Sequence, residues 1–210
     1  MANRRRMDPE ARRRELVSAA KRVFATKGVA GSTVSDIVKA AGVAQGTFYL
    51  YFATKSDVVN VVVEQMADGM VDAVERSVTG TEAGAVAKLV ALRDAILDLA
   101  NDAAGRELAG IYHRPENRAV HDRMAERMTP RLAPLLERIV RQGIAEGVFT
   151  AEDPRVAAWF VLGGLHALEV GFTDPAALPA AVTRATAYAL RALGHTAPTP
   201  ASVVRRRHAN

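Results

Sequence analysis

The chain contains no cysteine and one tryptophan, and aromatic residues make up only 5% of its 210 residues. Without cysteine it can form no disulfide, thiolate metal site or cysteine nucleophile. A cysteine-free chain fits a reducing compartment, so we expect a cytoplasmic protein. The arginines at 4–6 lead into Met-Asp-Pro-Glu and not into an apolar signal segment. The longest apolar zone, 156–172, is interrupted by His166 and Glu169, which predicts no membrane span.

Sequence motifs that carry catalysis or bind metal are absent as well. No His-x-x-x-His, Glu-x-x-His, nucleophile-elbow or phosphate-loop pattern occurs. His113 and His121 are eight residues apart, but Pro115 disrupts any helical face that they would share. The sequence therefore predicts a protein that is not an enzyme and that holds no metal or cofactor.

What the chain does contain is helical periodicity from end to end, without strand signals or repeats. Asp8 and Pro9 predict the start of a first helix, and Gly28 predicts its end. Further helices are expected at 55–77, 85–101, 106–112, 117–144, 154–171 and 178–193. Pro130 and Pro134 should kink or restart the helix at 117–144. We therefore expect an all-α fold with a domain boundary at 79–84, where the pattern breaks.

The most informative tract is 33–55, which predicts two short helices around a glycine turn and the start of a third. Thr33 and Asp36 have the spacing of a capping box at the first helix. Gly42 stands where a left-handed glycine would end that helix. Thr54 begins a second box of the same kind. This order of elements is a helix-turn-helix arrangement.

The second helix of this tract carries residues suited to reading DNA. Phe48 and Phe52 share one face and should pack inward, which core packing alone would also explain. The first turn of such a helix meets base edges in the major groove. Gln45 suits adenine, Gly46 lets the backbone approach, and Thr47 can contact a thymine methyl group.

Other residues of the tract are suited to holding the DNA backbone. Tyr49 and Tyr51 carry hydroxyl groups on rigid arms that fit phosphate oxygens. Lys55 opposes the dipole of the helix that it begins, and a phosphate bound there would relieve that cost. Residues 1–27 hold nine basic and three acidic residues, and residues 201–210 hold three arginines. A basic arm suits DNA, although solvated tails would have the same composition.

The segment Gly-Val-x-x-Gly-Thr-Phe-Tyr-x-Tyr-Phe-x-x-Lys at 42–55 follows a long helix and a Thr-x-x-Asp-Ile helix. It resembles the tetracycline-repressor (TetR) family of bacterial regulators over residues 12–60. The resemblance implies a homodimeric transcription factor, usually a repressor that a small molecule releases from a pseudo-palindromic operator on double-stranded DNA. By position it implies base contacts from Gln45, Gly46, Thr47 and Leu50, and phosphate contacts from Thr33, Tyr49, Tyr51 and Lys55. Ala44 departs from the family, which commonly has a capping Ser or Thr there.

The resemblance also implies a division of the chain. We expect a helix-turn-helix DNA-binding domain with a basic N-terminal arm at 1–54 and a connecting helix at 55–78. A helical ligand-binding and dimerisation domain should occupy 79–195, followed by a disordered basic tail at 196–210. The alternative is a helical DNA-binding or dimerisation protein without a small-molecule effector.

Candidate effector and dimer residues lie in the C-terminal half. An apolar or amphipathic effector would meet polar residues and an aromatic wall at Tyr112, His113, His121, His166, Glu169, Trp159 and Phe160. Glycine inside a helix costs about 1 kcal/mol relative to alanine, so close approach of a second helix should compensate. Self-association would supply it, with intramolecular packing as the alternative. The expected dimer residues are Gly163, Gly164, Ala167, Ala185 and Ala189.

Overall fold

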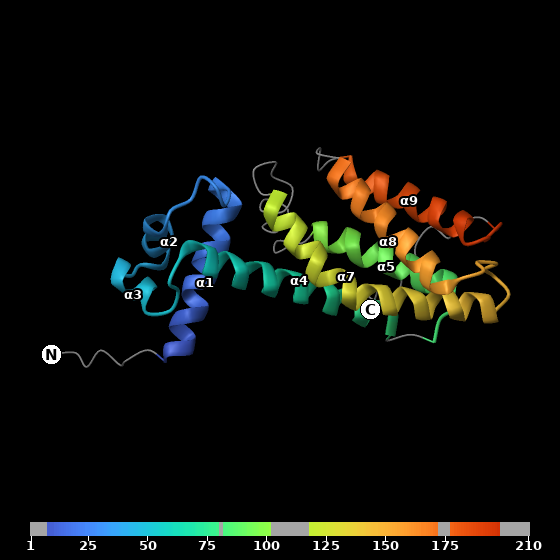
Figure 1. Ribbon diagram of the computed structural model, residues 1–210, viewed down its shortest axis with the longest axis horizontal. Helices are drawn as coiled ribbons and strands as arrows, with labels where there is room; N and C mark the ends of the chain where they lie inside the picture. The colour runs from blue at the N-terminus through green and yellow to red at the C-terminus, as the bar shows by residue number, and fades with distance from the viewer. Residues whose placement is uncertain (1–7, 80–81, 102–117, 172–176, 198–210) are drawn as a thin grey trace, which may run out of the picture.

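The computed structural model describes residues 8–79, 82–101, 118–171 and 177–197 (Figure 1). Within these ranges all regular structure is helical, which confirms the all-α prediction. The helix expected at 106–112 lies outside the described residues. The described helices are α1 (Pro9–Lys27), α2 (Val34–Ala41), α3 (Gln45–Tyr49), α4 (Lys55–Thr79), α5 (Ala85–Asn101), α7 (Arg118–Ala145), α8 (Pro154–Gly171) and α9 (Leu178–Ala192).

The helices gather into two groups that α4 and α7 join (Figure 1). The first group is α1 to α3 together with the beginning of α4, and its centre contains Leu16, Phe24, Ile37 and Phe48. The second group is α5, α8 and α9 with the far parts of α4 and α7. Because α4 contributes buried valines to both clusters, it connects the two groups as a single rigid element.

Local signals set the helix ends where the sequence predicts them. The Asp8 side chain accepts from the backbone N–H of Glu10, and Gly28 ends α1 with a positive φ of 73°. Asp153 accepts from the backbone N–H groups of Arg155 and Val156 at the start of α8. In each case a short polar side chain or a glycine satisfies the backbone groups that a helix end leaves without intrahelical partners.

The two prolines of α7 lie inside one continuous helix and do not restart it. Figure 1 shows the helix bending between its two ends, which is the kink that the prolines predict. Pro130 and Pro134 lie on the exposed side of the helix. The apolar side of α7 packs against α4, α5 and α8, and this packing holds the helix together.

The start of α5 is capped by Glu146, the residue that follows the end of α7. The backbone N–H of Ala85 donates to Glu146 Oε2 over 2.9 Å, and Gln142 Nε2 donates to Glu146 Oε1 over 2.6 Å. These bonds stabilise the charged carboxylate and hold the pKa of Glu146 below its ordinary value, with the Ala85 bond as the larger cause. The end of α7 is thereby fixed to the beginning of α5.

A row of arginines on α7 faces acidic and amide side chains on α4; we call Arg123, Arg127 and Arg131 the arginine ladder. Arg123 Nη1 donates to Asn60 Oδ1 over 2.7 Å, Arg127 Nη1 contacts Glu64 Oε1 at 3.2 Å, and Arg131 Nη2 contacts Asp72 Oδ1 at 2.8 Å. The ladder repeats every four residues, which is the spacing of one helical face. It therefore joins one face of α7 to the connecting helix α4.

Candidate nucleic-acid interface and ligand cavity

Helix α2 is held by a complete capping box. Thr33 Oγ1 accepts from the backbone N–H of Asp36 at 3.1 Å, and the backbone N–H of Thr33 donates to Asp36 Oδ2 at 3.0 Å. Lys27 of α1 also contacts the Asp36 carboxylate. Its hydrogen bond, followed by those of Thr33, lowers the pKa of Asp36 to about 2. Gly42 ends the helix in the left-handed conformation at φ 67° and ψ 31°, which the sequence predicts.

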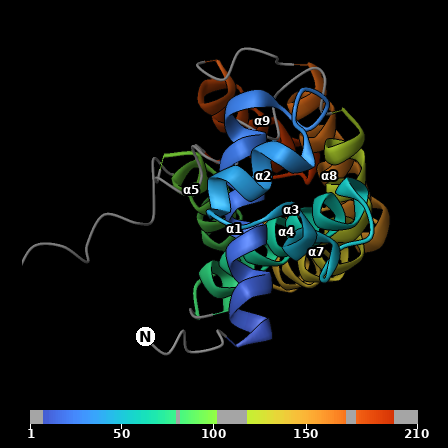
Figure 2. The ribbon, with the colours of Figure 1, turned by 90° about the vertical axis from the view of Figure 1, so that its left-hand side faces the viewer.

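The following helix, α3, turns its aromatic pair inward and its first turn outward. Phe48 and Phe52 are buried, with ring centroids 5.4 Å apart. Gln45 and Gly46 are exposed, and Thr47 is half-buried. Figure 2 looks onto this end of the molecule, where α2 and α3 lie toward the viewer. The first turn of the predicted recognition helix is therefore presented at the end of the molecule.

The other residues expected to contact DNA lie around the same helix. Leu50 is 80% exposed, so its side chain is not part of the apolar core. Tyr49 is exposed, and its ring meets Phe48 edge-on at 5.5 Å between centroids. Thr33 is exposed at the start of α2, whereas Tyr51 is half-buried against the core of the first group.

Helix α3 begins without a side-chain cap. Ala44 stands at the N-cap in an extended conformation, with φ −74° and ψ 151°, and no side chain accepts from the first turn. The sequence predicts this defect, because alanine has no acceptor atom. The helix that presents Gln45 is thus short and lacks the box found on α2 and at the Thr54–Asp57 start of α4.

Lys55 has a structural contact that its sequence position did not indicate. Its ammonium donates to the carbonyl oxygens of Val29 and Ser32, over 2.8 Å and 2.9 Å. These carbonyls belong to the turn between α1 and α2, so Lys55 ties the start of α4 to that turn. An ammonium has three N–H donors, so a phosphate can still take the third.

Several arginines of α1 also make contacts within the protein. Arg12 pairs with Glu15, and the Arg13 guanidinium lies over the Phe52 ring, 5.4 Å from its centroid. Arg22 Nη2 donates to the Ala40 carbonyl over 3.3 Å and so joins α1 to α2. These contacts order the helix-turn-helix unit and leave contacts to the DNA backbone as a prediction.

Comparison with known proteins identifies this unit. The family model described as "Bacterial regulatory proteins, tetR family" matches residues 16–62, which run from α1 into α4. Residues 16–62 thus form a tetR-family DNA-binding unit. The chain is 39% identical over 61 residues to the uncharacterized HTH-type transcriptional regulator YvdT of Bacillus subtilis, a match that covers 29% of this chain and 31% of YvdT. The match therefore spans about a third of that relative's length.

Two solved structures match the chain over most of its length and over most of their own. The fatty acid degradation regulator FadR from Bacillus halodurans is 28% identical, with a TM-score of 0.69, over 88% of this chain and 97% of FadR. A structure described as the SmeT-Triclosan complex is 22% identical, with a TM-score of 0.70, over 95% of this chain and 99% of SmeT. The helical fold is thus shared beyond the helix-turn-helix unit. None of the described helices combines the length and the apolar character that crossing a membrane requires.

The C-terminal helices form a half-open cavity of about 460 Å³ between α5, α8 and α9. Leu92, Arg93 and Ile96 line it from α5. Helices α8 and α9 contribute mostly small or apolar residues, including Phe160, Gly164, Leu168, Ala185, Tyr188 and Ala189. Its volume and its apolar lining are those of a small-molecule site.

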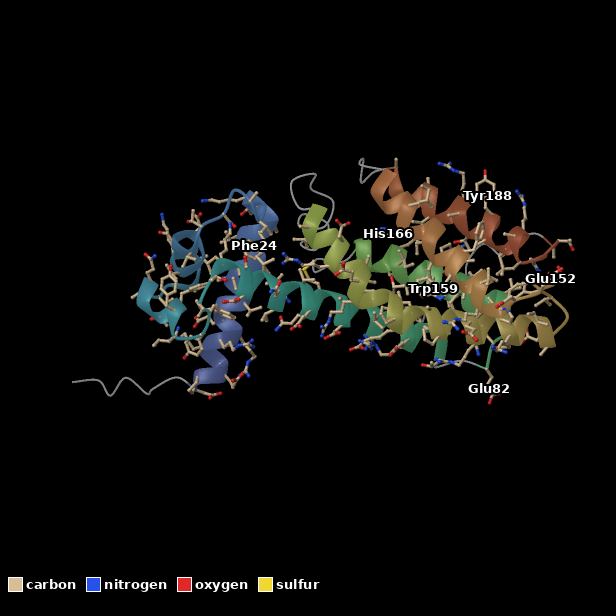
Figure 3. The ribbon with its side chains drawn as sticks, in the orientation of Figure 1. Phe24, Glu82, Glu152, Trp159, His166 and Tyr188 are labelled. Atoms are coloured by element: carbon tan, nitrogen blue, oxygen red, sulfur yellow. The ribbon has the colours of Figure 1, made fainter. Side chains whose placement is uncertain are left out.

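The residues predicted to form an effector pocket are only partly brought together. Phe160 lies at the cavity, but Trp159 lies in a different groove with Pro130, Pro134 and Arg155. Figure 3 shows Trp159 and His166 on α8, and His166 is not among the cavity residues. Tyr112 and His113 lie outside the described residues, as do the side chains of His121 and Glu169.

The residues predicted for a dimer interface lie in two places, on the exposed face of α8 and on α9 at the cavity. Gly163, Gly164 and Ala167 are exposed on α8, and a Cβ atom added to either glycine would meet no described atom within 4 Å. Ala185 and Ala189 are half-buried on α9 and line the cavity together with Gly164. Packing within the described chain thus gives no reason for the two glycines. Sequence reasoning missed Arg93, because an arginine in an amphipathic helix is normally assigned to the solvent side.

Proposed function

We propose that this chain is a transcriptional regulator that represses its target genes. In this proposal it binds a pseudo-palindromic operator on double-stranded DNA as a homodimer, in the cytoplasm, and a small apolar or amphipathic effector releases it. The observation that carries the proposal is the exposed first turn of α3, held on a buried Phe48 within a tetR-family helix-turn-helix unit. Relatives that match this unit are described as transcriptional regulators and repressors.

The proposal assigns two kinds of DNA contact. Gln45, Gly46, Thr47 and Leu50 would meet base edges, and Thr33, Tyr49, Tyr51 and Lys55 would meet phosphates. Recovery of bound genomic fragments tests the whole assignment, since a specific regulator enriches a shared two-fold motif. Gln45→Ala should relax the preference at one base pair, whereas Tyr51→Phe should weaken binding to all sequences alike. Fragments without a shared motif would contradict specific regulation.

For the dimer, we propose that α8 and α9 pack against the same helices of a second copy. Val156 and Phe160 on α8 and Tyr188 on α9 are large apolar or aromatic residues left exposed in one copy. Gly163 and Gly164, beside them on α8, would let the second helix approach closely. A specific interface typically buries about 1,200–2,000 Å², which an interface of α8 and α9 has to reach.

A bulky charge on this face tests the dimer. Gly163→Arg should give a folded monomer, because no described atom lies within 4 Å of the added Cβ. Gly69→Arg on α4 is the matched control, since Gly69 is also exposed with open space around it. Analytical ultracentrifugation should find a dimer for the unchanged chain and the control, and a monomer for Gly163→Arg. A dimeric Gly163→Arg would place the interface elsewhere.

The cavity supports an effector over the alternative of a DNA-binding protein without one. Helix α5 forms one wall of the cavity and packs on α4, which runs into the DNA-binding group. A ligand that favours one arrangement of α5 and α4 would change DNA affinity by its difference in affinity for the two arrangements. A related fold has been solved with triclosan, a small apolar compound, which supports the same type of ligand.

A further inference from the structure

One charged side chain interrupts the apolar lining of the cavity. Among the described residues around it, Arg93 is the one with a charge, and Thr186 and Tyr188 are the other polar ones. The Thr186 hydroxyl donates to the Val182 carbonyl over 3.0 Å, within its own helix. Tyr188 is 63% exposed, and Figure 3 shows it on the outer side of α9. Among the described lining residues, Arg93 is therefore the one with charged donors.

Arg93 is fixed in place although it is buried. Only 4% of its surface is exposed, and its Nε and Nη2 atoms donate to Asp94 Oδ1 over 2.9 Å and 2.6 Å. A guanidinium carries five N–H donors and no acceptor. Asp94 does not line the cavity, so it orients the guanidinium from outside. The cavity is thus lined by a residue whose charged head group is held by Asp94 and can only donate.

We propose that this cavity binds an amphipathic molecule whose hydrocarbon body fills the apolar walls and whose oxygen acceptor meets Arg93, and that it rejects cationic head groups. The inference rests on the proposed function, of which it names the effector's chemical class. An incoming carbonyl or carboxylate oxygen joins or replaces the partners that the guanidinium has in the ligand-free protein. Hydrogen bonds from a charged donor in a low-dielectric site are stronger than neutral ones. None of the described lining residues is anionic, so an ammonium there would meet the positive charge of Arg93 without a compensating carboxylate.

Three probes that share a ten-carbon chain test the head-group preference. They are decanoate, methyl decanoate and decylamine, and each is titrated calorimetrically into the full-length protein. We expect both acceptor probes to bind at least roughly tenfold more tightly than decylamine, the size of effect that one charge-assisted hydrogen bond gives. Shortening decanoate to octanoate should weaken binding roughly fourfold for each methylene removed. Equal or tighter binding of decylamine would overturn the proposal, as would the absence of binding by any probe.

Variants then locate the effect at Arg93. Removing one member of a buried ion pair leaves an uncompensated charge, so Arg93→Met is combined with Asp94→Leu. This double variant should bind decanoate and decylamine about equally while keeping the dependence on chain length. If it fails to fold, Arg93→Lys serves instead: its acceptor preference should persist, because the positive charge remains. An unchanged preference in the double variant, or a lost preference in Arg93→Lys, would contradict the assignment.

A cavity-filling variant separates this site from other apolar surfaces. Ala189→Trp should abolish binding of all three probes if the probes enter the cavity, and unchanged binding would overturn the proposal. Recovery of operator fragments by the unchanged protein is measured separately. Operator recovery without acceptor binding would refute the ligand class alone, whereas acceptor binding without operator recovery would refute the regulatory function alone.

Discussion

The missing cap of α3 gives a prediction whose size follows from local geometry. Ala44 already has the extended backbone of an N-cap residue, and its side chain is exposed. A serine hydroxyl at this position can accept from the N–H of Gly46 or Thr47 without backbone movement or burial. Ala44→Ser should therefore stabilise the protein by about 1 kcal/mol. For a chain of this length that corresponds to a rise in Tm of about 2–4 °C.

The same change should strengthen DNA binding if α3 becomes ordered only on the operator. The cap would then lower the free-energy cost of ordering α3 on DNA by up to about 1 kcal/mol, which corresponds to an affinity for the operator about five times higher. Differential scanning calorimetry and fluorescence anisotropy with operator DNA measure the two effects. Ala53→Ser is the matched control, because Ala53 is exposed and lies just before the Thr54 cap. An Ala44→Ser protein no more stable than the control would refute the reasoning.

Three further predictions concern contacts of the connecting helix and of the first capping box. Lys55→Met should lower the free energy of unfolding by about 1.5–3 kcal/mol, because two carbonyls lose a charged donor; urea denaturation that shows no change would contradict the contact. Asp36 has a folded pKa of about 2, below the ordinary value of 3.8, so the stability that it contributes is complete above the unfolded pKa and is lost as the pH falls toward 2. A carboxyl titration by NMR with a midpoint near the unfolded value would refute this. Replacing Arg127 and Arg131 together by glutamine should lower Tm slightly at low salt and not at about 1 M salt, where exposed ion pairs are screened. A loss that persists at high salt would mean that packing, and not charge, joins α7 to α4 at these residues.

Much of the DNA-binding unit could be predicted because its signals are local. The box of Thr33 and Asp36, the left-handed Gly42 and the uncapped Ala44 each depend on a few consecutive residues. Hydrophobic periodicity likewise predicted the helices of the C-terminal half, including one that spans Pro130 and Pro134. In that helix the prolines cost local hydrogen bonds, and packing on three neighbouring helices outweighed the loss.

The chemistry of the cavity could not be predicted in the same way. The periodicity of 85–101 gave the apolar face of α5, but not the burial of Arg93, which depends on the helices that pack against α5. Gly164 and Ala189 looked alike as small residues on helices, and only the tertiary structure placed both beside the cavity. The hydrogen bond from Lys55 to the Val29 carbonyl could not be predicted for the same reason, since the two residues are 26 positions apart in the sequence.

The sequence by itself thus determined the helices, their ends and the helix-turn-helix unit, because backbone hydrogen bonds and capping act within a few residues. The tertiary structure alone decided which side chains meet across helices: the ladder between α4 and α7, the tie at Lys55 and the donor in the cavity. Burial and charge at these places depend on residues brought together from distant parts of the chain, and no local pattern encodes that.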